Sequence, residues 1–311
     1  MLLSRTASVC LTVLAVILSP CANAGESSSG VRCPNPPDGW KLVWSDEFGG
    51  RGVPNPSSWS YHVGNGFNPG LGDFQGWGNG EWEWYRPENC TLSNGQLVLQ
   101  ADYSLTPTTI AGRNWYQRSC RITTQGKRAF KYGRIEARIA APHAAGAWPA
   151  FWMLGTSSGG TFTPNRRVPI EHYDTMVPNW ASCGEIDILE KRNYENLNTN
   201  NAFWDLRTGV FPWTFGQNAN YGSTSDVADM SAFHVYAIEW DATFIKWFVD
   251  GRQTHIIDIT PATLEEFHKP FYLVLDLALA GQFPQMNPDP AEFPLKMRVD
   301  YVRVYERRRT R

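Results

Sequence analysis

The segment GEIDILE, residues 184–190, places three carboxylates within six residues and separates them with aliphatic side chains that favour an extended strand. Because successive side chains of a strand point to opposite faces, Glu185 and Asp187 share one face. Strict alternation would turn Glu190 to the other face, whereas a single β-bulge at residues 188–189 would return it. We therefore predict a bulged strand that gathers three acidic side chains on one face.

Three carboxylates on one face have a chemical consequence. Their mutual repulsion raises the pKa of at least one of them and leaves a protonated carboxyl beside ionised ones. A proton donor beside an ionised nucleophile is the pair that cleavage of a glycosidic bond requires. The alternative is a solvated strand face with three unrelated acids, because short patterns of this kind recur by chance.

Composition narrows the class of protein. The chain has 311 residues, of which 42% are hydrophobic and 19% charged, which suits one large globular domain or two small ones. A net charge of −2 gives no indication of a nucleic-acid-binding surface. The 14 Trp, 12 Tyr and 16 Phe favour a carbohydrate-active protein only slightly, because aromatic rings stack on sugars but also fill sandwich cores.

Residues 1–24 have the pattern of a signal peptide. Arg5 precedes an apolar run over residues 9–18, and the small-x-small site Ala22-Asn23-Ala24 follows. The run is too short to span a membrane, so we expect cleavage after Ala24 and a secreted, extracellular chain with no membrane association. A lipoprotein attached through Cys21 is the weaker alternative, because a proline directly precedes that residue.

Four cysteines remain after this cleavage, namely Cys33, Cys90, Cys120 and Cys183. An even number in an oxidising compartment predicts two disulfides, with three possible connectivities. A bridge at Cys183 would stiffen the approach to the acidic strand, and the alternative is a free buried thiol. Asn89 begins a glycosylation sequon, which matters only if the host glycosylates.

The chain shows one all-β domain over residues 40–306. Residues 25–39 are polar and rich in Pro and Gly, which predicts a flexible lead-in, and the basic residues 307–311 predict a solvated tail. Short β-rich segments separated by Gly, Pro, Asn and Asp predict a sandwich, with one short helix at 261–268. The expected strands cover residues 41–44, 97–103, 132–140, 151–154, 185–190, 234–240, 245–249, 271–278 and 295–305.

The sequence gives little support for a serine esterase or a metal-dependent enzyme. Residues 155–159 match the esterase pattern G-x-S-x-G, but the sequence that follows cannot start the helix that this chemistry needs. The six histidines include no close metal-binding pair. By contrast, Trp148, Ala150 and Trp152 share one face of a predicted strand, where two tryptophans either pack in the core or form a stacking platform for a sugar ring.

Several motifs follow one another along the chain. They are WSDEF at 44–48, Asn79, Glu81 and Tyr85, NGQL at 94–97, YGRIEAR at 132–138, WPAFWML at 148–154, GEIDILE at 184–190, residues 233–241, Asp250-Gly251 and VDYVRVY at 299–305. In these ordered motifs the chain resembles glycoside hydrolase family 16, most closely the laminarinase-like (endo-β-1,3-glucanase) branch. The resemblance implies a β-jelly-roll sandwich of two curved antiparallel sheets with a substrate cleft on the concave face.

The resemblance also implies residue roles. Glu185 would be the nucleophile, Glu190 the general acid/base and Asp187 the assistant between them. Trp148 and Trp152 would line the sugar subsites. Asn79 and Glu81 would then hydrogen-bond the sugar.

Catalysis of this kind requires no cofactor, but the family often carries a structural calcium. Glu47, Gly95 and Asp300 stand at matching places. The sequence also departs from the branch, because residues 201–205 contain no histidine, Asp276 stands where Asn is common and Ala280 where Gly is common. These departures leave the acidic trio intact and put the substrate in doubt.

The sequence therefore predicts a secreted, monomeric, retaining endo-glycosidase whose partner is a polysaccharide, β-1,3-glucan first. The same mechanism could act on mixed-linkage β-glucan, β-galactan or an algal galactan. An alternative of another class is a β-glucan recognition protein that binds without cutting. Such relatives typically lose catalytic carboxylates, and all three are present here.

Overall fold

The computed structural model describes residues 36–66, 76–110, 112–156, 180–205 and 218–308. The predicted signal peptide, Cys33 and the last three residues lie outside them. Among the described residues, no helix is long and apolar enough to cross a membrane.

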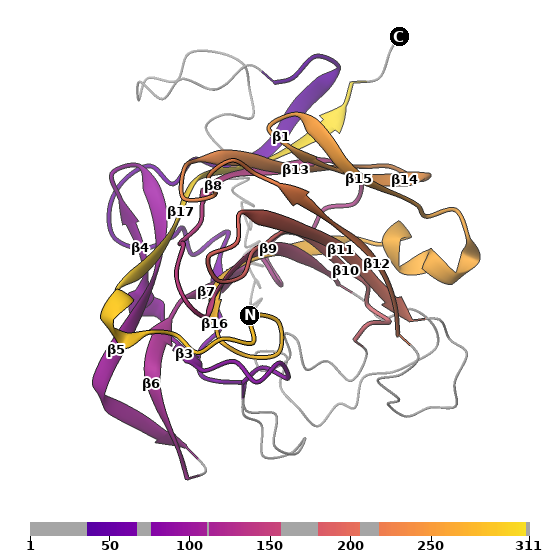
Figure 1. Ribbon diagram of the computed structural model, residues 1–311. Coiled ribbons are helices and arrows are strands. Elements are labelled where there is room, and N and C mark those ends of the chain that lie inside the picture. The colour runs from indigo at the N-terminus through magenta and orange to yellow at the C-terminus, as the bar shows by residue number, and fades with distance from the viewer. Residues whose placement is uncertain (1–35, 67–75, 111, 157–179, 206–217, 309–311) are drawn as a thin grey trace, which may run out of the picture.

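Two β-sheets face each other, as Figure 1 shows. The larger, ten-stranded sheet has the order β15-β14-β13-β8-β17-β5-β6-β3, with β1 beside β17 and β4 beside β5. Its strands are β1 (Trp40–Asp46), β3 (Glu83–Tyr85), β4 (Cys90–Ser93), β5 (Gln96–Ile110), β6 (Arg113–Ser119), β8 (Gly133–Ala140), β13 (His234–Trp240), β14 (Phe244–Val249), β15 (Arg252–Asp258) and β17 (Leu295–Arg307).

The smaller, seven-stranded sheet has the order β12-β11-β10-β9-β16-β7-β2. Its strands are β2 (Ser60–Tyr61), β7 (Arg121–Thr123), β9 (Ala147–Gly155), β10 (Glu185–Glu190), β11 (Leu197–Asp205), β12 (Asn218–Asp226) and β16 (Phe271–Leu279). The predicted jelly-roll sandwich is confirmed, with one difference: β3 pairs with β6 in parallel. Short 3-10 helices cover Pro87–Asn89, Ala262–His268 and Pro290–Glu292, and the second is the helix expected from the sequence.

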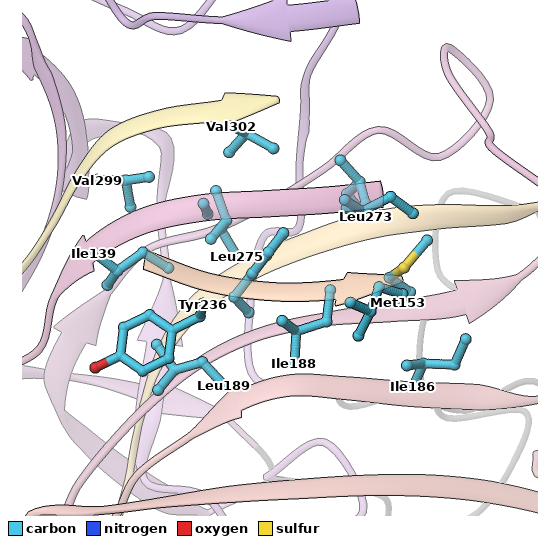
Figure 2. Packing of buried hydrophobic residues seen from close by; sticks show 14 of the residues in the cluster. Ile139, Met153, Ile186, Ile188, Leu189, Tyr236, Leu273, Leu275, Val299 and Val302 are labelled. Atoms are coloured by element: carbon cyan, nitrogen blue, oxygen red, sulfur yellow. The ribbon is translucent and has the colours of Figure 1, made fainter. Parts of the chain in front are cut away.

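The core lies between the two sheets. Along β16 every second residue from Phe271 to Leu279 enters it, and Phe151 and Met153 of β9 join them. Figure 2 shows Ile186, Ile188 and Leu189 of β10 in this layer, together with Val299 and Val302 of β17. Each fully buried side chain of this size contributes roughly 1.5–3 kcal/mol to folding. This burial fixes which face of β9, β10 and β16 points away from the core.

The outward face of these strands carries a second, smaller apolar cluster. It contains Ala150, Trp152, Leu154, Cys183, Tyr272 and Val274, with Trp180 packed against it. Trp152 therefore shares a face with Ala150, as predicted, and the polar site lies beside this cluster.

One disulfide joins Cys90 of β4 to Cys120, which directly precedes β7. Cys183 is a free, buried thiol, so the prediction that it takes part in a second bridge is wrong. It packs in the outward apolar cluster, and burial raises the pKa of its thiol to about 12. Asn89 is also buried, and its amide nitrogen donates to the Gln100 carbonyl (2.8 Å) and to Oδ2 of Asp102 (2.8 Å), so the folded chain does not offer it for glycosylation.

Two residues of the basic segment 307–311, Arg307 and Arg308, are exposed but are hydrogen-bonded to the start of the domain. β17 runs to Arg307, which pairs with Trp40 of β1. The backbone nitrogen of Arg308 donates to the Gly39 carbonyl over 2.9 Å. The two ends of the domain are thus hydrogen-bonded to each other.

Candidate active site

The acidic strand β10 contains the predicted bulge. Asp187 pairs with Trp152 of β9, but Glu190 pairs with Ala150, so one residue of β10 is extra between them. On the β11 side the register also shifts between Asp187 and Glu190. Because Ile188 and Leu189 both enter the core, Glu190 returns to the face that carries Glu185 and Asp187.

The bulge is supported by side chains that satisfy its backbone. A bulge interrupts the ladder and leaves carbonyl groups in need of donors. The Ile188 carbonyl accepts from Nδ2 of Asn200 (2.8 Å) and Nδ2 of Asn198 (3.4 Å), both buried on β11. The Asp187 carbonyl accepts from Nε1 of Trp247 on β14 (2.8 Å). The irregularity is therefore held by contacts from both sheets.

Two tryptophans bind the two glutamates. Nε1 of Trp180 donates to Oε2 of Glu185 over 2.8 Å. Nε1 of Trp148, on β9, donates to Oε1 of Glu190 over 2.9 Å. Trp180 packs on Phe203 of β11, with ring centres 5.5 Å apart, and Trp148 packs on a phenylalanine that follows β16. Each glutamate therefore keeps one oxygen beside an indole donor.

A fourth acid, Asp276 of β16, lies next to this group. Its Oδ1 accepts from Nε1 of Trp152 (2.7 Å), and its Oδ2 lies 3.1 Å from the hydroxyl of Tyr85. The same hydroxyl lies 3.2 Å from Oε2 of Glu81, whose Oε1 accepts from Nδ2 of Asn79 (2.9 Å). The structure thus links the predicted residues Asn79 and Glu81 to Trp152 through Asp276.

Arg121 brings a positive charge to this region. Its guanidinium carbon lies 4.9 Å from the ring centre of Trp152 and 5.0 Å from that of Trp77. Its positive charge lowers the pKa of Glu81, Glu185 and Asp276, although burial, the larger effect, raises all three. Trp152 is only 7% exposed and covered on one face by this arginine, whereas Trp148 is half-buried.

Burial dominates the electrostatics of the acidic trio. It raises the pKa of Glu185 to about 7 and that of Glu190 to about 8, and the indole donors act against this rise. Burial also raises the pKa of Asp187 well above its usual value, and the charges of Glu185 and Glu190 add to that effect. Near neutral pH the site therefore holds protons that it can give and take.

The sequence prediction of a structural calcium stays a prediction. Both carboxylate oxygens of Glu47 accept from Arg303, at 3.0 and 2.7 Å, and Oδ2 of Asp300 accepts from Arg138 at 2.8 Å. Gly95 has a φ of 73°. In the part of the chain that the structure describes, no group of three or more His, Cys, Asp or Glu side chains could hold a metal ion. This arrangement of carboxylates does not favour a cation, because arginines already occupy them.

Sequence reasoning placed the trio and Trp148 but missed Trp180, Arg121 and Asp276 as parts of one site. Only for Asp276 did the sequence offer a signal, since it departs from the residue common in the branch. The other two come from segments with no motif, and their proximity appears only once β7, β9, β10 and β16 are side by side.

Comparison with known proteins agrees with this geometry. The family model of glycosyl hydrolases family 16 matches residues 79–280. The chain is 34% identical to the clotting factor G alpha subunit of Tachypleus tridentatus over 86% of its own length and 34% of that protein. It is also 34% identical to a beta-glucanase of Rhodothermus marinus, over 86% of its own length and 85% of that protein.

A solved structure is similar as well. The catalytic domain of an endo-1,3-beta-glucanase (laminarinase) from Thermotoga petrophila RKU-1 superposes with a TM-score of 0.70 at 35% identity. The match covers 87% of this chain and 99% of that one. The chain belongs to glycosyl hydrolase family 16, as the sequence motifs predicted, and is a glycoside hydrolase with the jelly-roll fold.

Proposed function

We propose that this protein is a secreted, retaining endo-β-1,3-glucanase in which Glu185 is the nucleophile and Glu190 the general acid/base. One observation carries the proposal: the bulge in β10 puts Glu190 on the face of Glu185, and each carboxylate has its own indole donor. The similarity to a laminarinase and a beta-glucanase supports β-glucan as the substrate class.

The geometry supports a double displacement. In the first step Glu190 gives its proton to the glycosidic oxygen, and the ionised Glu185 attacks the anomeric carbon to form a glycosyl ester. Because Trp180 donates to Oε2 of Glu185, we assign the attack to Oε1. In the second step Glu190 takes a proton from water, which attacks the same carbon and releases Glu185.

Proton distribution agrees with these roles. Burial raises the pKa of Glu190 to about 8, so near neutral pH this carboxyl carries the proton that a general acid needs. Asp187 lies between Glu185 and Glu190 on the same face, where burial and then the charges of both glutamates raise its pKa. We assign it the assisting role.

Product analysis tests the proposal. Release of reducing ends from laminarin, lichenan, agarose and galactan identifies the linkage, and proton NMR of early products shows whether the β-anomer is retained. Binding of laminarin without cleavage of any polymer would overturn the enzymatic assignment in favour of a glucan-recognition protein. Cleavage of galactan alone would overturn the substrate.

Variants of Glu185 and Glu190 distinguish the roles of the two glutamates. Glu185→Ala and Glu190→Ala should both abolish hydrolysis of laminarin. With an activated aryl glycoside, azide should restore Glu185→Ala through an α-glycosyl azide and Glu190→Ala through a β-glycosyl azide, because azide replaces the nucleophile in one and water in the other. Exchange of these two outcomes would reverse the assignment.

A further inference from the structure

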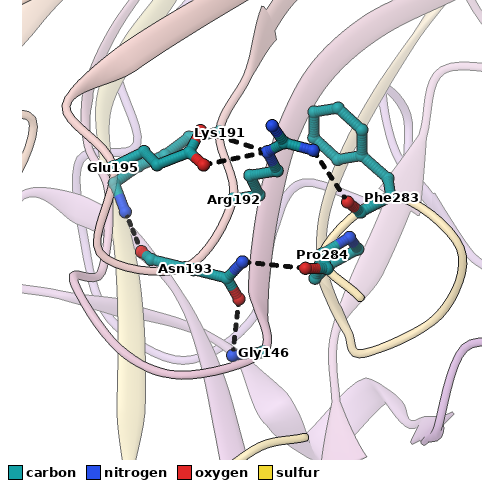
Figure 3. A network of polar contacts seen from close by, with 7 residues as sticks. All are labelled: Gly146, Lys191, Arg192, Asn193, Glu195, Phe283 and Pro284. Carbon is teal, nitrogen blue, oxygen red and sulfur yellow. Dashed lines mark hydrogen bonds and ion pairs between the residues drawn. The ribbon is translucent and has the colours of Figure 1, made fainter. Parts of the chain in front are cut away.

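The turn that follows β10, residues 191–195, is tied to the segment that follows β16, residues 281–285. Figure 3 shows these contacts. We propose that Arg192 and Asn193 are positioning residues, which hold Phe283 against Trp148 and thereby keep the Trp148 indole on Glu190. This inference rests on the proposed function of Glu190.

Asn193 joins three segments. Its Nδ2 donates to the Pro284 carbonyl (2.9 Å), and its Oδ1 accepts from the Gly146 nitrogen (2.9 Å), as Figure 3 shows. Its backbone nitrogen donates to the Ala147 carbonyl (2.9 Å). It is 7% exposed and has a φ of 52°, a conformation that asparagine tolerates better than most residues. The turn is therefore fixed both to the start of β9 and to the 281–285 segment.

Arg192 fixes the neighbouring residue of that segment. Its Nη1 donates to the Phe283 carbonyl (3.3 Å), and its guanidinium carbon lies 5.2 Å from the Phe283 ring centre. Nε of Arg192 donates to both carboxylate oxygens of Glu195, at 3.1 Å each, which orients the guanidinium. Backbone and ring of Phe283 are thus held by one side chain.

Phe283 in turn contacts the tryptophan of the site. The ring centres of Phe283 and Trp148 are 5.1 Å apart with planes inclined at 45°, and Trp148 is the donor to Glu190. Trp148 is only half-buried, and its orientation depends on the residues that pack on it, Phe283 among them. The chain of contacts runs from Arg192 through Phe283 and Trp148 to Glu190.

The other glutamate needs no such arrangement. Trp180, the donor to Glu185, packs on Phe203, which belongs to β11 and is held by the hydrogen bonds of the sheet. Phe283 lies on no strand, and the nearest backbone contact that holds its segment to another is from Gln282 to the Asn79 carbonyl (2.8 Å). Phe203 is held in place by its strand. Phe283 is held instead by its contacts with the turn at residues 191–195.

The expected effect follows from the hydrogen bond that Trp148 makes. This bond lowers the pKa of Glu190, so a looser Trp148 raises that pKa. Glu190 also faces Glu185 and Asp187 of its own strand and Asp276 of β16, and none of these is changed by the variants below.

The test is the pH profile of kcat/KM for Arg192→Ala on laminarin. Its basic limb should move to higher pH, and kcat should fall about ten-fold with little change in KM, because a misplaced acid acts on the transition state. Arg192→Lys should give an intermediate result. The matched control is Arg138→Ala, which removes an arginine of similar exposure, 39% against 41%, that also pairs with a carboxylate and lies over a phenylalanine.

A double-mutant cycle makes the result decisive. Phe283→Leu should produce the same shift, and Arg192→Ala combined with Phe283→Leu should add little to either change, because both act through Trp148. An unshifted basic limb in Arg192→Ala, or full additivity in the double variant, would overturn the positioning role. If Glu190→Gln keeps the basic limb of the wild type, the proposed function fails instead.

Discussion

The Trp180 indole nitrogen donates to Oε2 of Glu185 over 2.8 Å, and this bond stabilises the ionised carboxylate, which in the proposed mechanism attacks the sugar. Trp180→Phe removes the donor but keeps an aromatic ring against Phe203. The pKa of Glu185 should rise, so the acidic limb of kcat/KM should move to higher pH by about half a unit or more. Trp40→Phe, at a tryptophan of the other sheet, should leave the limb in place; an unmoved limb in Trp180→Phe would contradict the prediction.

Asp276 raises the pKa of Glu185, of Asp187 and of Glu190 through its charge. Asp276→Asn removes that charge, and an asparagine oxygen can still accept from Trp152. Both limbs of the kcat/KM profile should therefore move to lower pH. Initial rates measured across the pH range check this. Limbs that stay in place or move to higher pH would contradict the idea that the charge of Asp276 raises the pKa of the three acids.

Stability should depend on pH through Glu190. Its pKa in the folded chain, about 8, is raised above the usual 4.5, so the folded state binds more protons than the unfolded state between these values. The free energy of unfolding should thus fall as pH rises from about 5 to 8, by up to about 1.4 kcal/mol for each unit of pKa shift. Urea unfolding at pH 6.5 and 8 should show a smaller fall in Glu190→Gln. An equal fall in the free energy of unfolding in both proteins would contradict the raised pKa of Glu190.

Asn200 supports the bulge from β11, where its Nδ2 binds the Ile188 carbonyl and its Oδ1 accepts from Oγ1 of Thr254 (2.9 Å). Asn200→Ala leaves buried polar groups without these partners and should lower the free energy of unfolding by about 1–3 kcal/mol. It should also lower kcat, because Glu190 follows the bulge. Asn220→Ala, at an exposed asparagine of β12, is the control and should change neither quantity.

The sequence predicted what local spacing controls. Alternation placed Glu185 and Asp187 together, and the extra residue before Glu190 required the bulge that β10 shows. The aliphatic strands were found for the same reason, whereas β11, with its Asn-rich sequence, was missed because its polar inward residues bind the bulge rather than fill the core.

Contacts between distant segments were beyond reach of the sequence. Arg121 covers Trp152 and Phe283 packs on Trp148, yet neither residue lies in a recognisable motif. The same holds for Cys183. The even number of cysteines predicted that it pairs, but Cys90 and Cys120 bond to each other and Cys183 packs among apolar neighbours.

The three acids of β10 pair with regularly spaced residues of β9. Glu185, Asp187 and Glu190 stand opposite Leu154, Trp152 and Ala150, which are alternate residues of an unbroken strand. Removing Ile188 would therefore shorten the inner layer by one aliphatic side chain and leave all three acids opposite the same partners. The spacing of the three acids therefore follows from their partners on β9 and not from the number of residues in β10.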